Sequence, residues 1–389
     1  MRPIFLALPI IISLAACKVS DNAADGTATQ APSAPAIAAP DPLAAHDNQA
    51  VPQELPDSEA RPVMQAQVVL DRLSFTPGVV DGKPGLSTRN AVSGFQEAND
   101  LAVTGKMDAA TTAALAQYQA IPATRVVTIP ADFAAGPFVK LPKDPQDQAK
   151  LPGLGYETLD EKLAERFHTT IATLMLLNPG GMPAGSANAP APSASPPPTA
   201  KLDPAAAPLS TFRAGQQIRV PNVGGDVIAA SAAGDPAWQA TLAMLGVGSE
   251  QPKAARIVVS KSKGTLKAYD ESDKLIAVYT ATMGSTHDPL PLGDWGITGV
   301  SHNPKFRYNP DLFWDAKEGS EKAMLPPGPN GSVGVVWIDL TKPHYGIHGT
   351  PKPETIGRAE SHGCVRLTNW DAARLAQMVS TKTKVHFEA

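Results

Sequence analysis

Proline, alanine and serine divide this chain of 389 residues into separate folding units. Two stretches, residues 18–60 and 181–210, are rich in these residues and carry almost no large apolar side chains. Chains of this composition cannot bury enough apolar surface to form a core. The sequence therefore predicts a disordered tether at 18–60 and an insertion within a folded module at 181–210. The remaining length has room for two to three domains.

The first 17 residues have the pattern of an export signal. Their apolar run, residues 4–14, is too short to span a membrane but suits the core of a secretion signal. Small residues stand directly before Cys17, and this arrangement resembles the bacterial lipoprotein box. The resemblance implies that Cys17 is lipidated and that the protein is anchored at the periplasmic face of a Gram-negative envelope. Lys18 favours the outer membrane, and an ordinary cleaved signal is the alternative.

Cys364 is expected to be a free thiol, because the only other cysteine, Cys17, belongs to the leader. His362 and Arg366 lie close to it in sequence, and positive groups near a thiol lower its pKa and favour the nucleophilic thiolate. A second histidine, His348, stands sixteen positions before the cysteine, after a predicted short strand. Cysteine nucleophiles need a base within hydrogen-bond reach and a group that orients the base. Either histidine could be that base.

The glycines and polar residues around this cysteine suit acyl transfer. Glycine at 349 and 363 permits positive φ and lets successive backbone amides point at a developing oxyanion. The hydroxyl of Ser361 is expected to cap a turn, and Arg366 fits either a substrate carboxylate or a brace for the loop. The residues alone indicate thiol acyl transfer and leave the substrate open.

The complete pattern from residue 348 to residue 371 resembles the signature of the L,D-transpeptidase catalytic domain of bacterial cell-wall enzymes. It consists of His348-Gly349-Thr350, Gly357, Ser361-His362-Gly363-Cys364-Val365-Arg366-Leu367, Asn369 and Asp371. The resemblance implies that Cys364 is the nucleophile, that His348 is its base and that the main chain of Gly349 orients the ring. It further implies an oxyanion site at His362, Gly363 and Cys364, with substrate contacts from Thr350, Ser361 and Arg366.

The C-terminal region, residues 254–389, is predicted to be mainly β, as this catalytic domain is. Three β-rich runs between 256 and 281 form a meander, a strand covers 333–340, and a helix ends near Met378 before a last strand. An aromatic connection that contains Phe313 and Trp314 could be a lid or substrate wall, and Trp314 could equally fill the core.

Two further modules are expected upstream, so the chain is predicted to be multidomain. Residues 61–119 show three short helices, the second capped by Thr88, and resemble a small all-α peptidoglycan-binding domain. Its matching elements include Gln67, Asp81-Gly82, Phe95-Gln96 and Thr104-Gly105. Residues 153–223 resemble an α+β LysM carbohydrate-binding module, with a first strand at 156–159 and a returning strand at 214–221. Residues 120–152, which could add a strand, and 224–253 are predicted linkers.

Metal and nucleic-acid chemistry are not expected. His344, His348, His362 and Cys364 are separated by four, fourteen and two positions, which matches no short paired zinc motif. No cofactor is implied. The net charge of -4 and the pI near 6.1 lack the basic footprint of a nucleic-acid-binding protein.

The resemblance implies a lipid-anchored L,D-transpeptidase that crosslinks peptidoglycan stem peptides through a cysteine acyl-enzyme and is acylated by carbapenems. With water as the acceptor the same site would be an L,D-carboxypeptidase, and with a protein amine it would anchor proteins covalently to the wall. A non-catalytic lipoprotein that binds peptidoglycan is the alternative from a different class. The sequence leaves open the acceptor, the membrane, and whether the upstream modules bind glycan.

Overall fold

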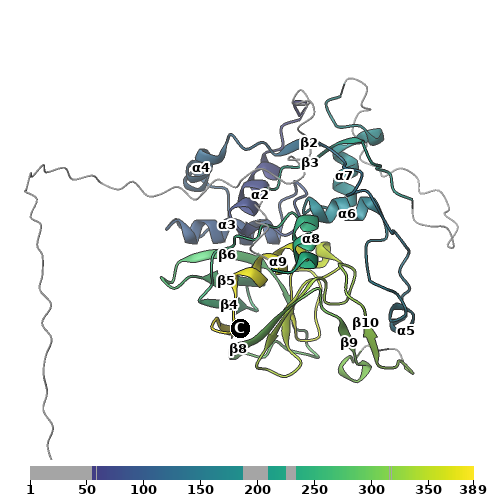
Figure 1. The fold of residues 1–389 in the computed structure, drawn as a ribbon. Coiled ribbons are helices and arrows are strands. Elements are labelled where there is room, and N and C mark those ends of the chain that lie inside the picture. The colour runs from purple at the N-terminus through teal and green to yellow at the C-terminus, as the bar shows by residue number, and fades with distance from the viewer. Residues whose placement is uncertain (1–54, 58, 187–208, 225–233, 315, 317) are drawn as a thin grey trace, which may run out of the picture. The chain divides into compact units, whose positions relative to one another are not determined.

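The computed structural model describes residues 55–57, 59–186, 209–224, 234–314, 316 and 318–389 (Figure 1). The predicted leader with Cys17, nearly all of the predicted tether, and residues 187–208 of the predicted insertion lie outside these ranges. Within the described ranges, no helix combines the length and the apolar character that crossing a membrane requires.

The first region is helical, as predicted. It contains α2 (Pro62–Arg72), the short strand β1 (Phe75–Thr76), α3 (Leu86–Ala98), α4 (Ala109–Leu115) and the 3₁₀ turn η1 (Ala116–Tyr118). Leu70, Val92 and Phe95 pack together in its core. The predicted cap at Thr88 is wrong, because α3 already begins at Leu86 after Gly85. The hydroxyl of Thr88 instead accepts a hydrogen bond from Gln67.

Two buried glutamines hold the turns of this helical region. The side-chain oxygen of Gln67 accepts from the amides of Asp81 and Gly82, and that of Gln96 accepts from Thr104 and Gly105. Each amide nitrogen donates to further oxygens of the same turn. Buried polar groups are costly unless they are paired, so these bonds explain why glutamine stands opposite each glycine turn.

The second region pairs β2 (Thr124–Thr128) with β3 (Gln217–Pro221) in an antiparallel ladder. Between these strands lie α5 (Pro145–Gln148), α6 (Leu159–Arg166), α7 (Ile171–Leu177) and the 3₁₀ turn η2 (Pro179–Gly181). The first strand predicted at 156–159 is wrong, since Thr158 caps α6 and Leu159 begins it. The strand instead comes from residues 120–152, which we predicted to link the domains or to add a strand, and thirty residues separate it from α6.

The third region is built on a ten-stranded sheet. Its strands are β4 (Arg256–Ser260), β5 (Thr265–Tyr269), β6 (Leu275–Thr280), β7 (Thr282–Met283), β8 (Gly293–His302), β11 (Val336–Leu340), β12 (Gly346–His348), β13 (Val365–Arg366) and β14 (Lys384–Glu388), joined by β1 of the helical region. The order is β1-β6-β5-β4-β14-β8-β11-β12-β13-β7. The predicted meander β4-β5-β6 is confirmed.

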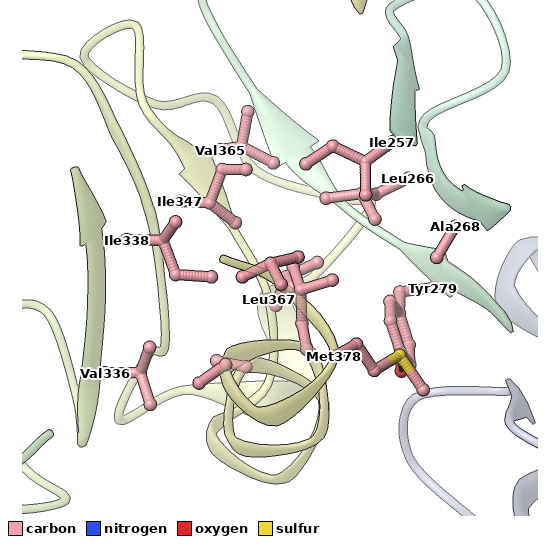
Figure 2. Close-up of a cluster of buried hydrophobic side chains, with 14 of the residues drawn as sticks. Ile257, Leu266, Ala268, Tyr279, Val336, Ile338, Ile347, Val365, Leu367 and Met378 are labelled. Carbon is pink, nitrogen blue, oxygen red and sulfur yellow. Dashed lines mark hydrogen bonds between the residues drawn. The ribbon is translucent and has the colours of Figure 1, made fainter. Parts of the chain in front are cut away.

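The sheet curls on itself. β6 and β7 stand near opposite ends of the strand order, yet only Ala281 separates them in sequence. The two ends of the sheet must therefore approach each other, and Figure 2 shows Ile257 and Leu266 facing Ile347 and Val365 within the enclosed core. The helices α8 (Pro236–Leu245) and α9 (Asn369–Met378) contribute to the same core.

The remaining short elements lie in the long connections of this region. β9 (Phe306–Tyr308) and β10 (Ala323–Leu325) form a two-stranded sheet, and the 3₁₀ turns η3 (Pro310–Leu312) and η4 (Pro353–Thr355) lie between strands. η4 belongs to the segment that joins β12 to β13.

The described parts of the helical region and of the sheet share one buried ion pair. Asp71 at the end of α2 accepts two hydrogen bonds of 3.0 Å from Arg374 of α9. It also lies 3.2 Å from Nδ1 of His168, whose ring stacks on Trp370. Burial alone raises the pKa of Asp71, but the guanidinium of Arg374 and the hydrogen-bonded ring of His168 outweigh this effect and hold the pKa well below its usual range. This carboxylate therefore joins all three regions.

Candidate active site

Two short parallel strands bring His348 and Cys364 to one place. β12 and β13 pair with Ile347 opposite Val365 and His348 opposite Arg366. Side chains alternate along a strand, so Ile347 and Val365 point together into the core, where both are fully buried. Gly346, His348 and Arg366, together with Cys364 just before β13, then lie on the other face. His348 is thus the diagonal neighbour of Cys364 across the ladder.

The ring of His348 is held in one orientation. It is buried, it stacks on Trp337 with centroids 5.5 Å apart, and its Nδ1 lies 2.7 Å from the carbonyl oxygen of Gly349. A carbonyl only accepts hydrogen bonds, so Nδ1 carries the proton and Nε2 keeps its lone pair free to act as a base. The sequence resemblance implied this orientation through the main chain of Gly349.

Both members of the pair are electrically neutral at rest. Burial and, to a smaller extent, Arg366 lower the pKa of His348 to about 3, against the opposing effect of the hydrogen bond to Gly349. Burial likewise raises the pKa of the Cys364 thiol, although the Gly346 amide and Arg366 act in the opposite direction. The positive neighbour Arg366 does lower the thiol pKa, as expected, but desolvation of the thiolate outweighs it, so the net shift is upward.

Glycines let the backbone pack tightly around the sulfur. Gly363 has φ +92°, and a Cβ there would lie 2.5 Å from Cε1 of Tyr345. Gly349 does not need positive φ, contrary to expectation, but a Cβ there would lie 2.2 Å from Oδ1 of Asn369. The sulfur of Cys364 lies 3.7 Å from the carbonyl oxygen of His344, to which the thiol donates. The thiol is therefore fixed from the side of the β11–β12 turn.

Replacing Gly363 with alanine is expected to destabilise the protein by about 1–3 kcal/mol, because the residue would be strained in backbone and in contact with Tyr345. The same change at Gly299, where a Cβ would meet no atom within 4 Å, is the matched control. Thermal unfolding of the two variants checks this. Equal melting temperatures for both would mean that the loop adapts to a side chain at 363.

Three residues predicted to contact substrate have different surroundings. Ser361 is buried, accepts from the amide of Gly284 at 2.6 Å, and donates to the carbonyl of Cys364 at 2.7 Å. Thr350 is also buried and accepts from the amide of Lys352. Both hydroxyls stabilise loops through these hydrogen bonds, which agrees with the interpretation that Ser361 caps a turn. Arg366 is half-buried and donates to the carbonyl of Glu360 at 3.4 Å.

Aromatic rings form one wall beside the cysteine. The ring of His362 contacts Phe313 edge-on at 5.0 Å between centroids and Trp314 at 5.7 Å. Trp314 stacks on His287 at 4.4 Å and is 58% exposed. The aromatic connection thus supplies a wall, and Trp314 does not fill the core.

Sequence reasoning missed several residues of this site. Tyr345 packs against Gly363, and Asp288 acts electrostatically on both Tyr345 and Cys364. Asn369 was noted only as part of the motif, yet its amide donates to Glu165 of α6 at 2.8 Å and so ties the motif to the second region. Of these residues, only Asp288 had a signal in the sequence, because it belongs to a turn, residues 284–288, that stands directly before the proline-rich segment. Among the described residues, no group of three or more His, Cys, Asp or Glu side chains could hold a metal.

Comparison with known families assigns two parts of the chain. Residues 254–387 match the family model of the L,D-transpeptidase catalytic domain, and residues 59–115 match that of a peptidoglycan-binding domain. The site described above lies within the first of these matches.

Known proteins resemble the C-terminal region. The Bacillus licheniformis protein named L,D-transpeptidase YkuD is 34% identical over 130 residues, which cover 33% of this chain and 63% of that protein. The Escherichia coli protein named L,D-transpeptidase YbiS is 40% identical over 135 residues, or 34% of this chain and 44% of that protein. The chain thus spans less than two thirds of each relative. The solved structure of the transpeptidase LdtMt1 in complex with imipenem covers 34% of this chain and 57% of its own at 17% identity and a TM-score of 0.27.

Proposed function

We propose that this chain, which carries an L,D-transpeptidase catalytic domain and a peptidoglycan-binding domain, crosslinks peptidoglycan stem peptides through a thioester on Cys364. The observation that carries the proposal is the hydrogen bond from Nδ1 of His348 to Gly349, which leaves Nε2 as a base on the strand beside Cys364. The match over residues 254–387 supplies the substrate class.

In the first half-reaction the Cys364 thiol gives its proton to Nε2 of His348 while the sulfur attacks the carbonyl that follows an L-centre in a donor stem. The amides of residues 362–364 face the developing oxyanion, helped by the positive φ of Gly363. A C–S bond forms, the adjacent C–N bond breaks, and the imidazolium protonates the leaving amine of the terminal D-residue. The products are a thioester and a free D-amino acid.

In the second half-reaction a side-chain amine from a neighbouring stem attacks the thioester. A new C–N bond forms, the C–S bond breaks, and a proton passes from the nitrogen through His348 to the sulfur. The thiol and the neutral imidazole are restored. Attack by water would give an L,D-carboxypeptidase, and attack by a protein amine would anchor that protein to the wall.

The acylation rate is expected to be nearly independent of pH between about pH 5 and pH 8. Below the raised pKa of its thiol, Cys364 stays protonated, and above the lowered pKa of about 3, His348 stays neutral. Both reacting forms are therefore fully populated across this window. Single-turnover acylation measured over the window checks this. A rate that climbs with a midpoint near pH 6 to 7 would instead indicate a thiolate–imidazolium pair.

The regions upstream suit attachment to the wall. The helical domain would bind peptidoglycan, and the LysM-like region would bind glycan at a cleft of about 660 Å³ beside η2 and β3, lined by Thr211, Arg213 and Gln216. Cys17 would carry the lipid that holds the protein in the envelope, with the outer membrane favoured. Acylation of Cys364 by carbapenems follows from the same thiol chemistry.

Product analysis tests the proposal. The purified protein and its Cys364→Ala variant are each incubated with disaccharide-tetrapeptide, and the masses of the products are measured by mass spectrometry. Cysteine-dependent dimers that lack one terminal D-residue support crosslinking, whereas tripeptide monomers alone indicate a carboxypeptidase. If neither protein changes the substrate but both bind sacculi equally, the chain is a non-catalytic wall-binding protein.

A further inference from the structure

An unpaired carboxylate lies beside the reactive sulfur. One oxygen of Asp288, Oδ2, is buried without a hydrogen-bond partner among the residues that the structure describes, and no described cation forms an ion pair with this side chain. Leaving a buried charged acceptor unpaired costs free energy that a surface carboxylate does not lose. A carboxylate that has one buried, unpaired oxygen in a reaction site is explained when a ligand supplies the missing donor.

The position of Asp288 is set by the strand next to the cysteine. β7 pairs with β13 so that Met283 lies opposite Val365, and Gly284 exchanges two hydrogen bonds with Ser361. The turn that follows is closed by mutual bonds between Ser285 and Asp288. It therefore begins at the wall of the Cys364 loop and is rigid without help from the carboxylate of Asp288.

The turn is also open to incoming molecules. His287 and Pro289 are exposed on either side of Asp288, and His287 stacks on the exposed ring of Trp314. Asp288 itself is half-buried between these two exposed residues. The carboxylate of Asp288 raises the thiol pKa of Cys364 and therefore hinders thiolate formation. Activation of the nucleophile thus does not explain its position.

We propose that Asp288 is a specificity-determining residue that binds the ammonium group of the acceptor and delivers it to the thioester on Cys364. The inference rests on the proposed function, because the second half-reaction is the step in which an acceptor ammonium group has to reach this sulfur. The bound R–NH3⁺ donates to Oδ2 and loses one proton to solvent. The neutral amine then attacks, the C–N bond forms, the C–S bond breaks, and the second proton reaches the sulfur through His348.

Asp288→Asn tests this, because it keeps the shape and removes the charge. The acyl-enzyme is formed with a tetrapeptide donor, and water competes with an added nucleophile for its thioester. Two nucleophiles are compared. One is a diamino-acid side chain, which is an ammonium ion at pH 7, and the other is hydroxylamine, which is neutral at that pH. Since the ratio of products counts only acyl-enzymes already formed, it does not depend on the acylation rate. The expected result is a fall of about tenfold or more in transfer to the ammonium acceptor, with transfer to hydroxylamine retained.

A matched control and a second readout keep the test decisive. Glu360→Gln removes the same charge from an exposed residue near Ser361 and should leave the product ratio as it is in the wild type. Asp288→Asn should also lower the thiol pKa, so that alkylation by neutral iodoacetamide at fixed pH becomes faster. An unchanged product ratio, or equal losses with both nucleophiles, overturns the role of Asp288. A wild type that is acylated but only hydrolyses overturns it too while leaving the acyl chemistry intact, and a wild type that is never acylated overturns the proposed function itself.

Discussion

Replacing His348 with glutamine is expected to slow formation of the thioester at Cys364 by about 10²–10⁴-fold, the usual contribution of a positioned general base. Glutamine can still donate to the carbonyl of Gly349, so the side chain keeps its place beside Trp337. It cannot accept the thiol proton as an imidazole does. Burst kinetics with a tetrapeptide donor, followed by the release of the terminal D-residue, measure the effect.

Two further histidine variants are needed to interpret this result. His386→Gln changes an exposed histidine of β14 that pairs with Asp294 of β8, and it should leave the burst unchanged. His362→Gln tests the other histidine that the sequence offered as a base. A small loss at His348 with a loss of more than a hundredfold at His362 would reverse the assignment of the base.

Replacing Asp71 with asparagine is expected to lower the free energy of unfolding by about 3–5 kcal/mol, the cost of breaking a buried ion pair by removing one partner. Arg374 and His168 would both lose a buried carboxylate on which their hydrogen bonds converge. Urea denaturation measures the change. Asp273→Asn is the control, because Asp273 pairs with Arg256 but is itself 72% exposed. A loss under 1 kcal/mol for Asp71→Asn would show that the pair is not needed for stability.

The same carboxylate gives a pH dependence with a definite sign. The pKa of Asp71 is lower in the folded protein than in the unfolded chain, so its contribution is complete above the unfolded value of about 4. It is lost as the pH falls below that value toward the folded pKa. Wild-type stability should therefore decline in acid more steeply than that of Asp71→Asn.

The sequence predicted those parts of the fold that depend on local patterns. Apolar residues recur at helical spacing in α2 and α3, and β-rich runs mark β4, β5 and β6. Each of these patterns predicts the element in which it lies. It misplaced β2, because a strand is stabilised by its partner, and β3 lies about ninety residues further on. The addition of β1 to the catalytic sheet has the same cause, since its partner β6 is two hundred residues away.

The candidate site was predictable as far as its motif reaches. His348 and Cys364 share a contiguous signature, and the orientation of the ring by Gly349 follows from adjacent residues. The ionisation state of Cys364 was not predictable from the sequence, because burial raises the thiol pKa by more than the positive neighbours lower it. Asp288 and Tyr345 reach the sulfur only through the curl of the sheet and the pairing of β7 with β13. Apart from the turn at residues 284–288, no local pattern in the sequence indicates these contacts.

Intact mass spectrometry of the protein during turnover tests the central claim most directly. With a tetrapeptide donor and no acceptor, the account predicts one added mass on Cys364, located by peptide mapping and equal to the mass of the donor minus that of the free D-amino acid that is released. The adduct should be absent from Cys364→Ala and should disappear when an amine acceptor is added, as the crosslinked product forms. An adduct on another residue, or crosslinked product from Cys364→Ala, would contradict the account.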